Sequence, residues 1–181
     1  EMLPFEINNK KINKFYLSLL KNKYFYAAAV TMPYKKFFFK KSLITDKFTS
    51  YAKSVNLILK INGKIYGYNT DITGALSSIP KKTSKVVIIG QGGTGQALLN
   101  VLFNLKKKTK FVLITSKKNY LKRMKNLKNG SKRIKIFSKI NNGIFEKTDL
   151  ILNCTPLGSN LKKSFVNKSP INESFFKIID K

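Results

Sequence analysis

The sequence predicts an α/β protein of two domains, and three features of its pattern support this fold class. Residues 85–156 alternate short apolar runs with segments of helical spacing, which is typical of a parallel sheet with crossover helices. Residues 54–70 contain two strand-like runs joined by Asn62-Gly63, a dipeptide favoured in tight hairpin turns. A polar segment that begins at Pro80 separates the two patterns. We therefore expect one domain at residues 1–80 and a second at residues 84–181.

The first domain is expected to begin with a helix over residues 11–21 and a strand over residues 24–30. Apolar side chains recur at helical spacing in the helix, and the second segment is a continuous apolar run that predicts a buried strand. Pro33 ends this strand because proline cannot donate the next ladder hydrogen bond. Thr31 and Lys35 are thus expected at the C-terminal end of a strand, where open α/β sheets bind ligands.

The second domain is expected to contain a parallel sheet. Apolar runs predict four buried strands, and apolar residues at helical spacing predict two helices. The strands are expected at residues 85–90, 110–116, 133–138 and 149–156. The helices are expected at residues 94–105 and 119–128.

The formal net charge of +28 suggests an anionic partner but does not favour nucleic acid. Of the 36 basic residues only Arg123 and Arg133 are arginines, and the lysines are scattered without a basic block. Abundant Lys, Asn, Ile and Phe indicate an AT-rich coding sequence. We expect no nucleic-acid partner; a nucleic-acid binder remains the alternative that salt-sensitive binding would reveal.

The residues that are rare or absent restrict the possible chemistry. The sequence has no histidine, which excludes histidine triads and histidine metal sites, and we expect no metal. Its single cysteine, Cys154, excludes an intrachain disulfide and suits a reducing compartment, so we expect a cytoplasmic protein. No apolar run reaches the length of a membrane span, and we expect no membrane partner. Acid–base chemistry is left to Lys, Asp, Glu or Tyr.

A glycine-rich loop predicts a dinucleotide site in a Rossmann-like domain. Gly90, Gly92 and Gly95 form the pattern G-x-G-x-x-G between an expected strand and an expected helix, which is the context the motif requires. The three glycines would permit a tight turn, approach of a pyrophosphate, and close packing of helix on strand. Gly93 and Thr94 complete the loop. The alternative is a glycine-rich turn without a ligand.

The residues after the next expected strand favour NADP over NAD. An NAD site usually carries an acidic residue about 20 residues past the first glycine. This chain has no acidic residue between Asp71 and Glu146, and it places Ser116, Lys117 and Lys118 after the strand instead. Two cations without a carboxylate suit a 2′-phosphate.

The chain resembles shikimate dehydrogenases in four stretches that occur in the family's order and approximate spacing. These are VTMPYK with Thr31 and Lys35, YGYNTD with Asp71, the glycine loop, and DLILNCTPLG. The resemblance implies an N-terminal substrate-binding α/β domain, followed by a Rossmann-like NADP-binding domain. It also implies reduction of 3-dehydroshikimate to shikimate with NADPH, in aromatic amino-acid biosynthesis.

The resemblance further implies a role for individual residues. Lys35 and Asp71 would form the catalytic pair, and Thr31, Asn56 and Asp71 would bind substrate. The cofactor would be held by residues of the glycine loop, the following strand and the DLILNCTPLG stretch: Gly90, Gly92, Gly93, Thr94, Gly95, Ser116, Lys117, Lys118, Thr155, Pro156 and Leu157.

Some positions depart from the family pattern, and they keep other functions open. Ala27 and Ala29 stand in the G-x-N-V-T segment, Leu57 replaces a threonine, and the 2′-phosphate arginine is absent. The family's N-terminal Ser-x-Ser segment and C-terminal helix are not in the chain, so we expect that this chain alone does not complete the substrate site. The alternatives are a quinate/shikimate-type dehydrogenase that accepts NAD and an inactive dinucleotide-binding module. We expect a monomer or homodimer.

Overall fold

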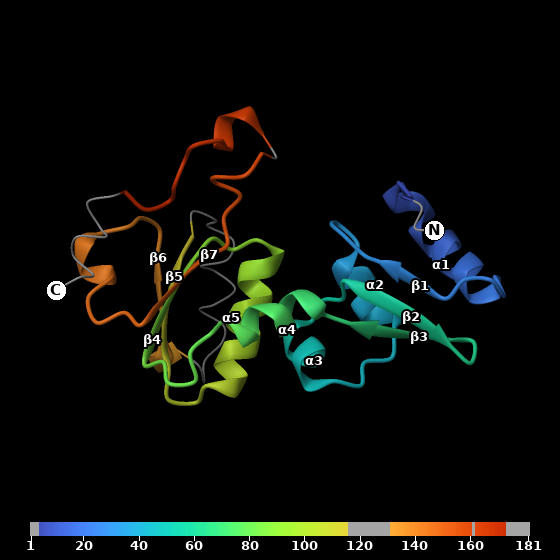
Figure 1. Ribbon diagram of the computed structural model, residues 1–181, viewed down its shortest axis with the longest axis horizontal. Helices are drawn as coiled ribbons and strands as arrows, with labels where there is room; N and C mark the ends of the chain where they lie inside the picture. The colour runs from blue at the N-terminus through green and yellow to red at the C-terminus, as the bar shows by residue number, and fades with distance from the viewer. Residues whose placement is uncertain (1–3, 116–130, 161, 173–181) are drawn as a thin grey trace. The chain divides into compact units, whose positions relative to one another are not determined.

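The computed structural model describes residues 4–115, 131–160 and 162–172 (Figure 1). It divides into two compact units, Glu1–Gly74 and Ala75–Lys181. This boundary falls inside α4 (Thr70–Ser77), a few residues before the polar segment where we expected it. The difference arises because Leu76 and Ile79 already pack against the core of the second unit.

The first unit contains a three-stranded antiparallel sheet in the order β1-β2-β3 (Figure 1). The expected hairpin is confirmed: β2 (Leu57–Ile61) pairs with β3 (Lys64–Tyr68) along its whole length. Asn62 and Gly63 join them with φ of 48° and 74°. Both values lie in the left-handed region that a two-residue hairpin turn of this kind requires.

The strand expected at residues 24–30 is shorter and more exposed than its sequence suggests. β1 (Ala27–Ala29) has three residues and, among the described strands, pairs with β2 alone, at the edge of the three-stranded sheet. Tyr24 and Tyr26 are 73% and 72% exposed, whereas Val30 is buried. The prediction of a buried strand was therefore wrong for most of this segment, because an edge strand has a ladder partner on one side only.

Helices precede and follow the strands of this sheet, and only the first of them was expected. α1 (Ile12–Lys21) follows the short 3₁₀ helix η1 (Asn9–Lys11) and confirms the prediction for residues 11–21. α2 (Lys35–Lys41) and α3 (Lys47–Ala52), together with α4, were not predicted. The buried core of the unit combines α1, α2 and the sheet through Ile12, Leu19, Val30, Phe38, Val55, Ile58 and Ile65.

The second unit has the expected parallel sheet, in the strand order β6-β5-β4-β7. Its strands are β4 (Lys85–Ile89), β5 (Lys110–Ile114), β6 (Ile134–Phe137) and β7 (Leu150–Asn153). α5 (Gly93–Leu105) follows β4, as predicted, and the shorter 3₁₀ helices are η2 (Ser131–Arg133), η3 (Asn142–Ile144) and η4 (Lys163–Phe165). The helix expected at residues 119–128 lies outside the described residues.

Alternate residues of the central strands supply two separate cores, one on each face of the sheet. Val86 and Ile88 pack with Leu99 and Leu102 of α5 on one face. Val87 and Ile89 face the other side, in a cluster that includes Phe145. The carboxyl end of β4 is thereby fixed between two packed layers, and the glycine loop begins there. None of the helices in the described ranges is long and apolar enough to cross a membrane.

Candidate active site

Three main-chain hydrogen bonds bring the separate motifs of the first unit to one end of its sheet. Val30 N donates to Asn56 O at 2.7 Å, and Asn56 N donates to Tyr68 O at 2.9 Å. Val55 N donates to Lys35 O at 3.0 Å. The residue after β1, the last residue of β3 and the residue before β2 therefore lie close together, near the start of α2.

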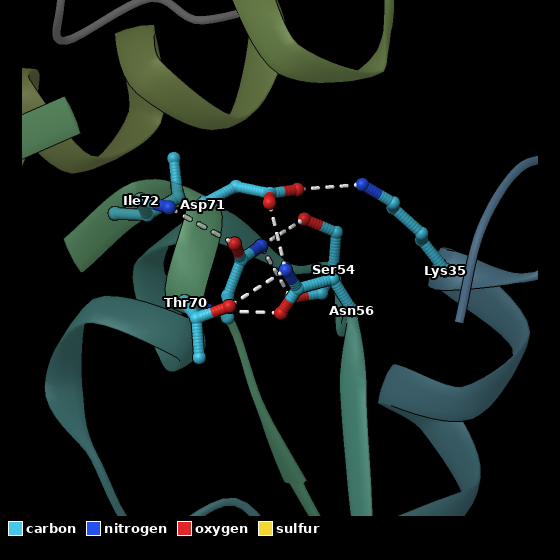
Figure 2. A network of polar contacts seen from close by, with 7 residues as sticks. Lys35, Ser54, Asn56, Thr70, Asp71 and Ile72 are labelled. Carbon is cyan, nitrogen blue, oxygen red and sulfur yellow. Dashed lines mark hydrogen bonds and ion pairs between the residues drawn. The ribbon is translucent and has the colours of Figure 1, made fainter. Parts of the chain in front are cut away.

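Lys35 and Asp71 form an ion pair at this end of the sheet. Lys35 Nζ lies 2.6 Å from Asp71 Oδ2, although the two residues are 36 positions apart (Figure 2). Lys35 is the first residue of α2, and Asp71 lies in the first turn of α4. Their side chains are 29% and 50% exposed, so a small molecule can reach both. The structure thus brings the expected pair together; its catalytic role remains a prediction.

Asn56 contacts the other oxygen of the Asp71 carboxylate. Its Nδ2 donates to Asp71 Oδ1 at 2.8 Å and to Thr70 Oγ1 at 2.9 Å. Its Oδ1 accepts from Thr70 N at 2.8 Å. Figure 2 shows Asp71 between Lys35 and Asn56, so each carboxylate oxygen has its own partner.

The sequence reasoning missed a buried asparagine two residues before Asp71. Asn69 Nδ2 donates to Ser54 O at 2.9 Å and to Ser54 Oγ at 2.8 Å, while its N donates to Thr49 Oγ1 at 2.8 Å. Its Oδ1 accepts from Ile72 N at 3.1 Å, the pattern of a helix N-cap. Asn69 is buried, and it fixes the first turn of α4 that carries Asp71. An Asn directly before Thr-Asp was the available signal for such a cap.

Thr31 lies at the same end of the sheet. It follows Val30, whose N–H pairs with Asn56, and its own carbonyl accepts from Tyr34 N at 3.0 Å. This turn leads into α2, and the Thr31 side chain is exposed. Its predicted contact with substrate remains a prediction.

In the second unit, packing explains two of the glycines in the loop. Gly90 has φ of 97°, and a Cβ there would lie 2.9 Å from the main chain of Cys154. A Cβ on Gly95 would lie 2.2 Å from the carbonyl oxygen of Gly90. The first glycine therefore makes the tight turn and the last allows α5 to pack close to β4, as the pattern predicts.

The remaining glycines leave space where an anion would approach. A Cβ on Gly93 would meet nothing within 4 Å, and one on Gly92 would have only Cys154 O at 4.0 Å. Gly92 is the N-cap of α5 and provides no side-chain cap, so the first N–H groups of the helix are not satisfied by this residue. Thr94, also at the helix start, is exposed. These features fit a pyrophosphate bound to the helix N-terminus.

The segment after β7 lies beside this loop. Cys154 N donates to Ile89 O at 2.7 Å, and the Thr155 methyl group would contact a Cβ on Gly90. Asn153 Oδ1 accepts from Thr155 N at 3.0 Å and from its Oγ1 at 2.7 Å, and Thr155 Oγ1 in turn accepts from Leu157 N at 3.3 Å. This turn holds Thr155, Pro156 and Leu157 next to the glycine loop.

Two acidic residues of the second unit, Glu146 and Asp149, lie at the opposite ends of β4 and β7. Asp149 Oδ2 accepts from Lys85 N at 2.8 Å and from Ser84 N at 2.6 Å. These backbone bonds lower the pKa of Asp149 below its ordinary value. Burial lowers the pKa of Lys85, whose Nζ donates to Glu146 O at 2.7 Å. Asp149 and Glu146 thus lie where β4 and β7 begin, away from the glycine loop.

Two expectations about ligands remain predictions. Ser116, Lys117 and Lys118 lie outside the described residues, so their role with a 2′-phosphate remains a prediction. In the described ranges, no group of three or more His, Cys, Asp or Glu side chains could hold a metal ion.

Comparisons with known proteins point to one family. No protein-family model matches the chain. A shikimate dehydrogenase (NADP(+)) of Methanosphaera stadtmanae is 34% identical over 136 residues, which cover 71% of this chain and 48% of that protein. The enzyme of the same name from Clostridium botulinum strain Hall is 30% identical over 167 residues, with 88% of this chain and 61% of that protein covered.

A solved structure agrees with these matches along almost the whole chain. The crystal structure of shikimate dehydrogenase from Aquifex aeolicus has a TM-score of 0.72 and 26% identity, and it covers 94% of this chain and 62% of that chain. The chain spans about half to three-fifths of the length of the curated relatives named above. Sequence and structure together show that the chain belongs to the shikimate dehydrogenase family.

Proposed function

We propose that the protein containing this chain reduces 3-dehydroshikimate to shikimate with NADPH. The observation that carries this proposal is the contact of 2.6 Å between Lys35 Nζ and Asp71 Oδ2, at an exposed end of the sheet. The names of the relatives, shikimate dehydrogenase (NADP(+)), support both the reaction and the cofactor.

The ion pair suits the reduction of a ketone. NADPH, when bound, supplies the hydride. Negative charge then develops on the carbonyl oxygen, where the Lys35 ammonium stabilises it and donates a proton. Asp71 holds the ammonium through Oδ2 and can accept a hydrogen bond from a neighbouring substrate hydroxyl. Thr31 and Asn56 lie at the same end of the sheet and are proposed to contact the substrate.

The second unit is proposed to bind the cofactor. The open space at Gly92 and Gly93 and the start of α5 would hold the pyrophosphate. Ser116, Lys117 and Lys118 would contact the 2′-phosphate, and Thr155, Pro156 and Leu157 would lie toward the nicotinamide. We also propose a cytoplasmic location, since a single cysteine suits a reducing compartment.

The test is an assay of the protein expressed from its own gene, following NADPH oxidation in the presence of 3-dehydroshikimate. We expect turnover that Lys35→Ala lowers by about 10²–10⁴-fold, the usual contribution of a general acid. Lys40→Ala is the matched control, since Lys40 is exposed on the same helix. Near-normal turnover in Lys35→Ala would refute the role of the pair. Activity with quinate and NAD alone would identify the other dehydrogenase, and no activity with either substrate would indicate an inactive binding module.

A further inference from the structure

We propose that Thr70 is a positioning residue for the reaction, and this inference rests on the proposed function. Thr70 fixes the orientation of the Asn56 side-chain amide, and Asn56 in turn fixes the carboxylate that holds Lys35. No motif or comparison assigns a role to Thr70, which is exposed at the first position of α4.

The hydrogen bonds allow only one orientation of the Asn56 amide. Its oxygen accepts from Thr70 N, while its nitrogen donates to Thr70 Oγ1 and to Asp71 Oδ1 (Figure 2). A flipped amide would place its oxygen against a carboxylate oxygen and its N–H groups against the Thr70 N–H. Both contacts would be repulsive, because two acceptors or two donors would face each other. Thr70 therefore presents one donor and one acceptor that together select the productive orientation.

The fixed amide determines which carboxylate oxygen is available to Lys35. Asn56 occupies Asp71 Oδ1 at 2.8 Å, and Lys35 takes Oδ2 at 2.6 Å. A half-exposed carboxylate and a long lysine side chain hold each other weakly when no third group restricts them. Preorganisation of the ammonium accordingly depends on the chain of contacts from Thr70 through Asn56 to Asp71.

Different residues of the network stabilise the fold and orient the Asn56 amide. The buried Asn69 caps α4, whereas the exposed Thr70 hydroxyl bonds only Asn56 among the contacts described for it. Thr70→Val keeps the β-branched shape and the backbone N–H and removes only the hydroxyl acceptor. Thr70→Ser keeps the hydroxyl. Thr73→Val makes the same change on the same helix, at an exposed residue without a described contact to Asn56 or Asp71.

The first test compares steady-state kinetics of the full protein with 3-dehydroshikimate and NADPH. Thr70→Val is expected to lower kcat by about five- to tenfold, the effect of losing one hydrogen bond in the network. The KM for NADPH and the melting temperature should not change. Thr70→Ser should keep kcat within about twofold of the parent enzyme and Thr73→Val should leave it unchanged. A Thr70→Val change that lowers kcat only together with the melting temperature would show a merely structural role and overturn the proposal.

The second test needs no turnover, so it distinguishes failure of this inference from failure of the proposed function. The side-chain NH₂ signals of Asn56 are recorded by NMR, and acetylation of Lys35 is followed by mass spectrometry. Thr70→Val should shift the Asn56 signals and speed acetylation of Lys35, whereas Thr73→Val should do neither. Unchanged Asn56 signals in Thr70→Val would overturn the positioning role. If the Asn56 signals shift in a protein that has no dehydrogenase activity, the contact network is supported and only the proposed reaction is refuted.

Discussion

The ion pair between Lys35 and Asp71 contributes little to the stability of the fold. Exposed ion pairs contribute about 0–1 kcal/mol to stability, and both members of this pair are partly exposed. We therefore expect the ion pair to contribute to catalysis more than to stability. We predict that Lys35→Arg keeps the charge and the fold but lowers turnover about 10²–10⁴-fold, since a guanidinium does not give up its proton at neutral pH. Turnover close to that of the parent enzyme, measured at saturating NADPH, would show that charge alone suffices.

Cys154 is expected to be an unreactive thiol. Burial raises its pKa from 9.0 to about 11, because the charged thiolate is disfavoured away from water. This higher pKa makes the fraction of thiolate at neutral pH roughly 100-fold smaller. The thiolate is the form that reacts as a nucleophile. Alkylation by iodoacetamide at pH 7.5 should therefore be about two orders of magnitude slower than for a free cysteine in a peptide. Equal rates would contradict the placement of Cys154 between β7 and the glycine loop.

At the residue scale, motifs with an unusual composition were predictable and contacts made through ordinary polar residues were not. The glycines stand out in the sequence through their spacing, and the resemblance to the family's motifs pointed to Lys35 and Asp71. Asn69 and Thr70 belong to the same Asn-Thr-Asp stretch, yet their partners lie in residues 49–56. Local sequence does not indicate those partners, because the fold alone brings the two segments together.

At the scale of single elements, the junction of β4 and α5 provides a sharp test of the glycine loop. Gly95→Ala places a Cβ against the Gly90 carbonyl, a main-chain atom that cannot easily move. We predict a loss of about 1–3 kcal/mol in the free energy of unfolding, measured with denaturant. Gly93→Ala is the matched control, because the added Cβ meets nothing. It should change stability by less than about 1 kcal/mol; equal losses in both variants would contradict close packing at Gly95.

The beginnings of β4 and β7 are joined by Asp149, and this contact should depend on pH. The backbone N–H groups of Lys85 and Ser84 lower the pKa of Asp149 in the folded state. Its contribution to stability is therefore fully present above the unfolded pKa of about 3.9 and is lost as the pH falls through the lower folded value. Asp149→Asn should reduce the melting temperature at pH 7, with turnover kept within a few-fold. The difference from the parent protein should shrink below about pH 4, and a difference independent of pH would contradict the contact.

The elements that could be predicted are those in which the apolar pattern of the sequence matches the burial of the side chains in the structure. Strands β4 and β5 are buried on both faces, so a continuous apolar run indicated them correctly. The segment that ends in β1 has a similar apolar run but lies at an edge, where its tyrosines are exposed. α2 reads KKFFFKK, and three consecutive phenylalanines show no helical period. Its helix therefore depends on burial of Phe38 in the tertiary core, which overrides local pattern.

At the scale of the whole molecule, part of the positive charge serves the fold. Lys60 Nζ donates to the carbonyls of Leu20 at 2.6 Å and Asn22 at 2.9 Å, at the end of α1. Arg133 donates to the carbonyls of Lys106 at 2.9 Å and Phe103 at 3.1 Å, at the end of α5. Cations at helix C-termini satisfy carbonyls that have no partner within the helix and interact favourably with its dipole. The chain has only 8 acidic residues, so main-chain carbonyls bind these cations where carboxylates often do so in other proteins.

The positive charge should affect cofactor binding in two ways, by long-range attraction and by local contacts. Measurements of affinity at different salt concentrations can distinguish the two. A net charge of +28 attracts any anionic dinucleotide, an effect screened over about 8 Å at 0.15 M salt and about 30 Å at 0.01 M. The preference for NADPH over NADH is instead predicted to depend on local contacts from Ser116, Lys117 and Lys118 to the 2′-phosphate. We expect a modest preference, because lysine supplies a point charge and lacks the planar donor fork of arginine.

Titrations of both cofactors, followed by nicotinamide fluorescence at low and high salt, would test this division. Both affinities should fall as salt rises, while NADPH remains the tighter ligand at each concentration. Lys117→Ala should reduce the ratio of the two affinities by several-fold. Lys108→Ala removes an exposed lysine between α5 and β5, at the ends of the strands opposite to the glycine loop. This change should weaken the binding of both cofactors equally. If NADH binds as tightly as NADPH, or if the two lysine variants behave alike, the positive charge acts only as a general field and the segment after β5 does not select the cofactor.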